Sequence, residues 1–64
     1  MFESREELFE EAFEEYMREN HMNFYDVCIY DWDCFEEFLV SRFGERVLTD
    51  RDYQEWMEDT MESI

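Results

Sequence analysis

Apolar residues recur every three or four positions through the first third of the chain. They are Leu8, Phe9, Ala12, Phe13, Tyr16 and Met17. At about 100° per residue these side chains fall on roughly one half of a helical wheel, and glutamates fill the other half. The pattern predicts an amphipathic helix over about residues 4–19. Ser4 as N-cap and Glu7 three residues later form a capping box, while Arg18 and Asn20 suit the C-terminal end, where Asn tolerates a left-handed cap.

The next apolar run, FYDVCIY over residues 24–30, fits two kinds of element. Its aromatic and β-branched residues favour a strand, but the only short stretch available as a partner strand is 46–48. As a helix, the run has an N-cap in Asn23 and an acidic residue, Asp26, three positions later. We therefore expect a helix over 24–30, and an α+β fold with a strand there is the alternative.

A third helix is predicted over residues 33–43. Asp33 and Glu36 form an Asp-x-x-Glu start signal, and Gly44 suits a left-handed C-cap. The expected core face is formed by Phe35, Phe38, Leu39 and Phe43. A helix continuous from residue 24 would place Asp31 among apolar side chains, so we expect a break near that residue.

The last helix is predicted over about residues 50–62, with Thr49 as its N-cap and Asp52 at the third position. Its apolar stripe contains Tyr53, Trp56, Met57, Thr60 and Met61. An acidic row on the opposite side contains Asp52, Glu55, Asp59 and Glu62. The chain has no proline and one glycine, and no linker is recognisable. Residues 1–64 therefore form one domain, an all-α fold of three or four helices.

A chain of 64 residues has a small core, because it buries only about 60% of its unfolded surface. Seven Phe, four Tyr and two Trp compensate with large side chains. A homodimer would be another source of stability.

Several classes of function lack the residues they need. No catalytic motif is present, so we expect neither an enzyme nor a cofactor. Cys28, Cys34 and His21 fall short of a four-ligand zinc set, and the Asp31–Asp33 stretch lacks the glycine and final glutamate of an EF-hand loop. We find no secretory signal and no apolar run long enough for a membrane span, and expect reduced thiols and a cytoplasmic location in a host cell.

Charge is the most unusual property of the chain. Twenty acidic residues stand against five basic ones, all arginine, which gives a formal net charge of −15. Two rows at four-residue spacing contain Glu3, Glu7, Glu11, Glu15 and Glu19, and Glu6, Glu10 and Glu14. Like charges at this spacing destabilise a helix. The carboxylates between residues 3 and 15 follow one another about every 2.5–3 Å of helix axis, against about 1.7 Å for the phosphates of duplex DNA.

In size, charge and aromatic content the chain resembles the acidic DNA-mimic proteins of phages and mobile elements. These include antirestriction proteins, anti-CRISPR proteins and uracil-DNA glycosylase inhibitors. The ending Glu62-Ser63-Ile64 is similar to a Glu-Ser-Ile element of some glycosylase inhibitors. The hydrophobic element that those inhibitors insert into their target is not identifiable in this sequence. The resemblance implies an inhibitor that occupies a nucleic-acid site.

The sequence thus predicts a nucleic-acid mimic that binds the basic groove of a host defence protein, a CRISPR–Cas effector or a restriction enzyme, rather than nucleic acid or membranes. The expected partner-binding residues are Glu3, Glu7, Glu10, Glu11, Glu14, Glu15, Asp52, Glu55, Asp59 and Glu62. One alternative is a helical adaptor that binds a protein through exposed aromatics, with Trp32, Phe2 or Tyr25 as candidates. Another is adaptation to high salt, which the many Phe and Met residues fit poorly.

Overall fold

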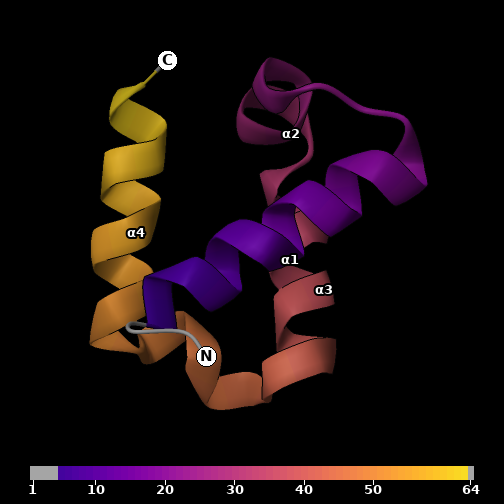
Figure 1. Cartoon of the computed structure of the whole chain (residues 1–64). Coiled ribbons are helices and arrows are strands. Elements are labelled where there is room, and N and C mark those ends of the chain that lie inside the picture. The colour runs from indigo at the N-terminus through magenta and orange to yellow at the C-terminus, as the bar shows by residue number, and fades with distance from the viewer. Residues whose placement is uncertain (1–4, 64) are drawn as a thin grey trace.

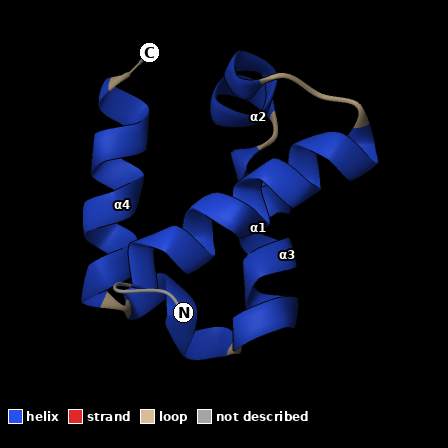
Figure 2. Ribbon diagram, in the orientation of Figure 1, coloured by secondary structure: helices blue, strands red, loops and turns tan. Residues whose placement is uncertain are grey.

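The computed structural model describes residues 5–63, and all regular elements in that range are helical (Figures 1 and 2). The elements are α1 (Arg5–Asn20), α2 (Phe24–Tyr30), α3 (Trp32–Phe43), the 3-10 helix η1 (Glu45–Thr49) and α4 (Arg51–Glu62). Helix α1 runs across α3 and α4, and α2 packs on α3 (Figure 1). The predicted all-α fold of three or four helices is confirmed, with four α-helices and one 3-10 helix within residues 5–63. The alternative strand over 24–30 is wrong, because these residues form α2.

A left-handed residue ends α1, one position later than the sequence indicated. Asn20 remains helical, and its side-chain amide donates to the carbonyl of Tyr16 at 2.9 Å. His21 adopts the left-handed conformation instead, with φ 54°. The amide of Met22 then donates to the carbonyl of Met17 at 3.0 Å, as in a Schellman motif, and both side chains pack against the core. The predicted N-cap of this helix, Ser4, lies outside the described residues.

Asp31 separates α2 from α3, as its polarity predicted. Helix α2 begins after Asn23, whose side chain accepts from the amide of Asp26 at 2.9 Å. Asp31 is both the C-cap of α2 and the N-cap position of α3, with φ −128° and ψ 16°. Helix α3 starts at Trp32, so Asp33 lies in its first turn and does not precede it. A carboxylate in the first turn is still favourable, because it lies near the positive end of the helix dipole.

Gly44 and Asp50 cap the two helices that the 3-10 helix η1 connects, α3 and α4. Gly44 ends α3 with φ 107° and ψ 163°, a conformation that side chains disfavour, and its amide donates to the carbonyl of Val40 at 2.8 Å. The prediction of Thr49 as the N-cap of α4 is wrong, because Thr49 belongs to η1 and its hydroxyl donates to a carbonyl there. Asp50 caps α4 by accepting from the amide of Asp52 at 2.8 Å.

The core is a cluster of aromatic rings centred on Phe13. Its ring centroid lies 5.1 Å from that of Phe35, 5.7 Å from that of Trp56 and 5.8 Å from that of Trp32. The fully or largely buried side chains are Phe9, Ala12, Phe13, Tyr16, Val27, Cys28, Phe35, Leu39, Val47, Tyr53 and Trp56. All four α-helices and η1, through Val47, therefore contribute to one core. The predicted inner faces of α1, α3 and α4 are confirmed, with Leu8, Met17, Phe38, Phe43, Met57 and Met61 half-buried at the margin.

Candidate acidic binding surface

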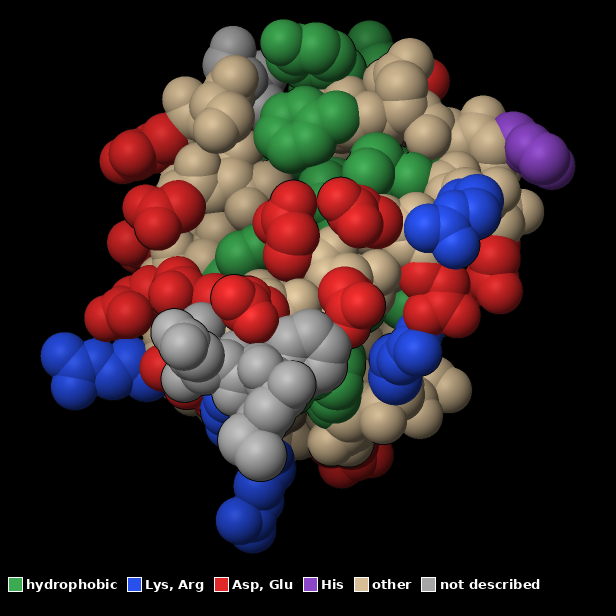
Figure 3. All heavy atoms as spheres, viewed as in Figure 1, with side chains coloured by type: hydrophobic (Ala, Val, Ile, Leu, Met, Phe, Trp, Pro, Cys, Tyr) green, Lys and Arg blue, Asp and Glu red, His purple; other side chains and the backbone are tan. Residues whose placement is uncertain are grey.

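Carboxylates gather on the solvent sides of α1 and α4, two helices that pack against each other. Figure 3 shows acidic side chains over both helices in one view, with arginine side chains toward the sides and bottom. This position follows from the helical pattern, because the same turns that bury Phe9 and Phe13 direct the intervening glutamates outward. We call the exposed glutamates between residues 7 and 14 of α1 the α1 acidic row: Glu7, Glu10, Glu11 and Glu14.

The predicted partner-binding residues divide into several groups. Those that are exposed and form no ion pair within residues 5–63 are Glu7, Glu10, Glu11, Glu14, Asp59 and Glu62. Glu15 pairs with Arg42, and Glu55 lies 3.8 Å from Arg51 across one turn. Asp52 is half-buried in the first turn of α4. Glu3 lies outside the described residues.

Three carboxylates accept hydrogen bonds from the polar tips of core aromatics. The indole nitrogen of Trp56 donates to Glu10 at 3.0 Å. The hydroxyl of Tyr16 donates to Asp31 at the junction of α2 and α3. Glu36 likewise accepts from a core hydroxyl, that of Tyr53, at 2.9 Å. No buried side-chain nitrogen or oxygen in the described part of the chain lacks a partner. Some of the acids therefore stabilise the core and are not free to bind a partner with both oxygens.

These hydrogen bonds shift the titration of the two core tyrosines. Burial, followed by the hydrogen bond to Asp31, raises the pKa of Tyr16 above its ordinary value. Burial, followed by the hydrogen bond to Glu36, raises the pKa of Tyr53 in the same way. A neighbouring carboxylate opposes the formation of phenolate, so both hydroxyls remain donors at neutral pH.

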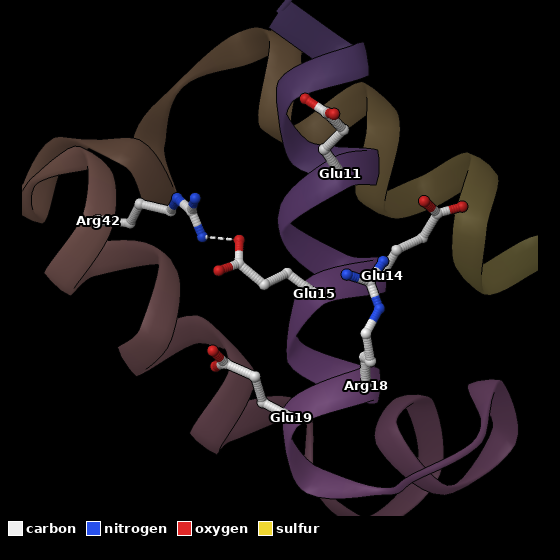
Figure 4. A pocket seen from close by; sticks show the side chains of 6 residues that line it. All are labelled: Glu11, Glu14, Glu15, Arg18, Glu19 and Arg42. Atoms are coloured by element: carbon white, nitrogen blue, oxygen red, sulfur yellow. Dashed lines mark hydrogen bonds and ion pairs between the residues drawn. The ribbon is translucent and has the colours of Figure 1, made fainter.

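A hollow of about 380 Å³ lies between α1 and α3. Its lining residues are Glu11, Glu14, Glu15, Arg18, Glu19 and Arg42. Figure 4 shows Arg42 reaching from α3 to pair with Glu15, while Arg18 extends along α1 in the direction of Glu14. The two guanidinium groups supply positive charge at this end of α1. Arg5 and Arg51, the first residues of α1 and α4, supply positive charge at the N-terminal ends of these two helices.

The spacing of the α1 acids compares with that of nucleic-acid phosphates. Five carboxylates from Glu6 to Glu14 follow one another over about 12 Å of helix axis, or about every 3 Å. One strand of DNA carries a phosphate about every 3.4 Å, and the duplex about every 1.7 Å. Sequence reasoning omitted one exposed acid of α4, Glu58. The i, i+3, i+4, i+7 pattern of residues 55, 58, 59 and 62 was the signal that could have found it.

The thiols give no sign of nucleophilic or metal chemistry. Cys28 is buried in α2 and burial raises its pKa; Cys34 is exposed on α3, where its hydrogen bond to Asp31 is the main cause of a raised pKa. The reactive thiolate is therefore disfavoured at both positions. Within residues 5–63, no group of three or more His, Cys, Asp or Glu side chains is arranged to hold a metal ion. In the same range, no helix has the length and apolar character needed to cross a membrane.

A second surface feature is apolar, and of its three residues the sequence had suggested only Tyr25 as an exposed aromatic. Three large side chains of α2 are exposed: Tyr25 by 55%, Ile29 by 54% and Tyr30 by 82%. Trp32, which the adaptor alternative placed on the surface, is half-buried and donates its indole N–H to the hydroxyl of Tyr53 at 3.2 Å. Phe2, also named for that alternative, lies outside the described residues. The helical pattern of FYDVCIY places Phe24, Val27 and Cys28 on one face, and the structure packs all three inward, which leaves Tyr25, Ile29 and Tyr30 toward solvent.

Comparison with known proteins found no match. Neither the sequence nor the structure of this chain matches a known family, a curated protein or a solved structure.

Proposed function

We propose that the protein is an acidic nucleic-acid mimic. It binds the basic nucleic-acid groove of a host defence protein, a CRISPR–Cas effector or a restriction enzyme, and so prevents that protein from holding DNA or RNA. The type of target follows from the resemblance to the antirestriction and anti-CRISPR proteins. The proposal needs no catalytic residue and no cofactor, since the inhibitor acts by occupying a site.

The observation that carries the proposal is the exposed and largely unpaired carboxylates of α1 and α4. Folding alone does not require them, because like charges four residues apart, such as Glu7 and Glu11, destabilise a helix by a few tenths of a kcal/mol. A glutamine or lysine at either position would keep the helix and remove the repulsion. The retained cost is understandable if a basic partner compensates for it.

The helical scaffold explains how such a surface would compete with nucleic acid. Phe9 and Phe13 anchor α1 in the core, so the carboxylates are held in a row before the partner arrives. A basic groove that receives them releases the counterions condensed on both surfaces and replaces its contacts with phosphates. The ordering cost of association is smaller because the row is preorganised.

The test uses a panel of purified CRISPR–Cas effectors and restriction enzymes, with inhibition of DNA cleavage as the first readout. For any enzyme that is inhibited, the dissociation constant is measured for the wild type and for the Glu7→Gln/Glu11→Gln variant. We expect this variant to bind at least about tenfold more weakly, and wild-type affinity to fall steeply with salt. DNA should displace the protein from the enzyme.

The matched control is Glu37→Gln/Glu45→Gln, which removes the same charge from exposed positions outside α1 and α4. Its affinity should stay within about threefold of the wild type, because only the long-range field changes. Equal losses in both variants would show that net charge and not the α1 acidic row matters. An inhibited enzyme that still bound DNA with unchanged affinity would rule out mimicry.

The adaptor alternative keeps one supporting observation. Trp32 is packed into the core and Phe2 is outside the described residues, but Tyr25 is more than half exposed. An apolar side of α2 is therefore available for a protein partner. It also bears on the mimic proposal, since both surfaces could contact the same target.

A further inference from the structure

The exposed side of α2 combines aromatic rings with nearby negative charge. We call Tyr25, Ile29 and Tyr30 the α2 apolar patch. They are the exposed large hydrophobic side chains of residues 5–63, and all three belong to α2. The charged residues closest to them in sequence are acids, Asp26 within α2 and Asp31 directly after Tyr30, and α2 contains no lysine or arginine.

The protein contains internal examples of an arginine held by an aromatic ring and a carboxylate together. Arg5 lies over the ring of Phe9, 5.8 Å from its centroid, and also pairs with Asp50. A guanidinium group stacks on an aromatic face and at the same time donates to a carboxylate, which suits arginine better than lysine.

A second arginine repeats this arrangement. Arg42 lies over the ring of Phe38, 5.6 Å from its centroid, and pairs with Glu15. In the described part of the chain no arginine lies over Tyr25 or Tyr30. The α2 patch therefore presents rings and neighbouring carboxylates without a cation of its own.

We propose that the α2 apolar patch is a second contact site, which takes arginine side chains from a basic protein partner. The inference rests on the proposed function in one respect: the partner is the same basic protein that the α1 acidic row contacts. Helix α2 packs on α3, which also contacts α1, and Figure 3 shows hydrophobic side chains in the region of α2 and acidic side chains of α1 on the same face of the molecule. One partner surface would therefore contact both helices. Arginine-rich grooves carry the charge that the acidic row needs and the planar groups that the rings can stack on.

Charge also decides between this occupant and a second copy of the chain. Two copies would bring together two molecules of net charge −15, each with Asp26 and Asp31 next in sequence to the patch residues Tyr25 and Tyr30. Like charges at an interface oppose association. An arginine-bearing surface removes that repulsion and covers the same apolar area.

The test measures binding of fluorescent deca-arginine and deca-lysine peptides by anisotropy at low salt. Both carry the same charge, so the ratio of their dissociation constants reports the arginine preference. We expect the wild type to bind deca-arginine about five- to tenfold more tightly. Tyr25→Leu/Tyr30→Leu, which keeps apolar area but removes the rings, should lower that ratio at least about threefold and leave deca-lysine binding unchanged. Tyr25→Phe/Tyr30→Phe should retain the preference.

The outcomes separate the two proposals. If the wild type binds neither peptide, the acidic surface does not take basic partners and the proposed function fails. If it binds both and the leucine variant keeps the same ratio, the inference about α2 is wrong while the proposed function stands. A wild-type dimer in sedimentation that the leucine variant dissociates would also overturn the inference, because the patch would then be a self-contact. Circular dichroism spectra of all variants should match the wild type, since both side chains are largely exposed.

Discussion

Helices α1 and α2 depart from an ordinary surface helix in opposite directions. The outer side of α1 carries more like charge than its stability favours, whereas the outer side of α2 exposes rings and an isoleucine that a small domain would otherwise bury. Both helices nonetheless contribute to the same core, α1 through Phe9 and Phe13, and α2 through Val27. The difference teaches that the inner sides of these helices follow from folding, while each outer side has a feature that folding does not explain.

The largest effect should come from the inner side of α1. Phe13→Ala removes the ring at the centre of the aromatic cluster and leaves a cavity, so we expect a loss of about 3–5 kcal/mol in the free energy of unfolding. Ile29→Ala on the outer side of α2 should change it by about 0.5 kcal/mol or less, because the side chain is 54% exposed. Urea unfolding followed by circular dichroism measures both. A large loss for Ile29→Ala would mean that the α2 apolar patch is structural.

The next effect concerns the hydrogen bond that ties α1 to the end of α2. Tyr16→Phe removes the donor to Asp31 and should cost about 1–2 kcal/mol at neutral pH. The wild type should also lose stability above about pH 10. Burial and the Asp31 hydrogen bond raise the pKa of Tyr16, so the unfolded chain ionises first and the stabilisation is complete only below that pH.

Thermal melts between pH 7 and 11 test this dependence. The Tyr16→Phe variant should show a smaller alkaline loss than the wild type, with the remainder due in part to Tyr53, whose pKa is raised in the same direction. Equal alkaline losses in the two proteins would show that Tyr16 does not contribute. The conservative change keeps the ring that packs against Phe35 at a centroid distance of 5.5 Å, so the core packing is preserved.

A smaller effect is expected at the start of α2. Asn23→Ala removes the side chain that accepts from the amide of Asp26, and loss of such a cap costs about 1 kcal/mol. A helix of seven residues has few bonds of its own, so amide hydrogen exchange should accelerate in α2 more than in α1. Asn20→Ala at the exposed end of α1 is the control and should affect α2 exchange little.

The sequence predicted most of the fold because the periodic signals were strong. The positions of Phe9, Ala12, Phe13 and Tyr16 indicated both the helix and its buried side, and Asp31 marked the break between two helices. Adjacent capping residues were harder to separate. Thr49 and Asp50 are both good N-caps, and only the extra 3-10 turn, which incorporates Thr49, decided in favour of Asp50.

The candidate site was predicted less completely, for a physical reason. Periodicity shows which carboxylates point outward, but not which of them meet a partner from another helix. Glu10 accepts from Trp56, which is 46 residues away in sequence, and Glu15 pairs with Arg42. The exposure of Tyr30 depends on how the short helix α2 packs on α3, which the apolar residues at both ends of this segment do not specify.

The smallest expected effect is a gain in stability. Glu11→Gln removes one charge from the α1 acidic row and relieves repulsion from Glu7 and Glu15, each one turn away, so the free energy of unfolding should rise by a few tenths of a kcal/mol at low salt. The gain should shrink in molar salt, which screens the same repulsion. Glu15→Gln is the matched change on the same helix. It also gives up the pair with Arg42 and should show no such gain. Precise urea titrations at two salt concentrations compare the variants. A Glu11→Gln variant that is less stable than the wild type at low salt would mean that this carboxylate serves the fold, and the outer side of α1 would then no longer differ from its inner side.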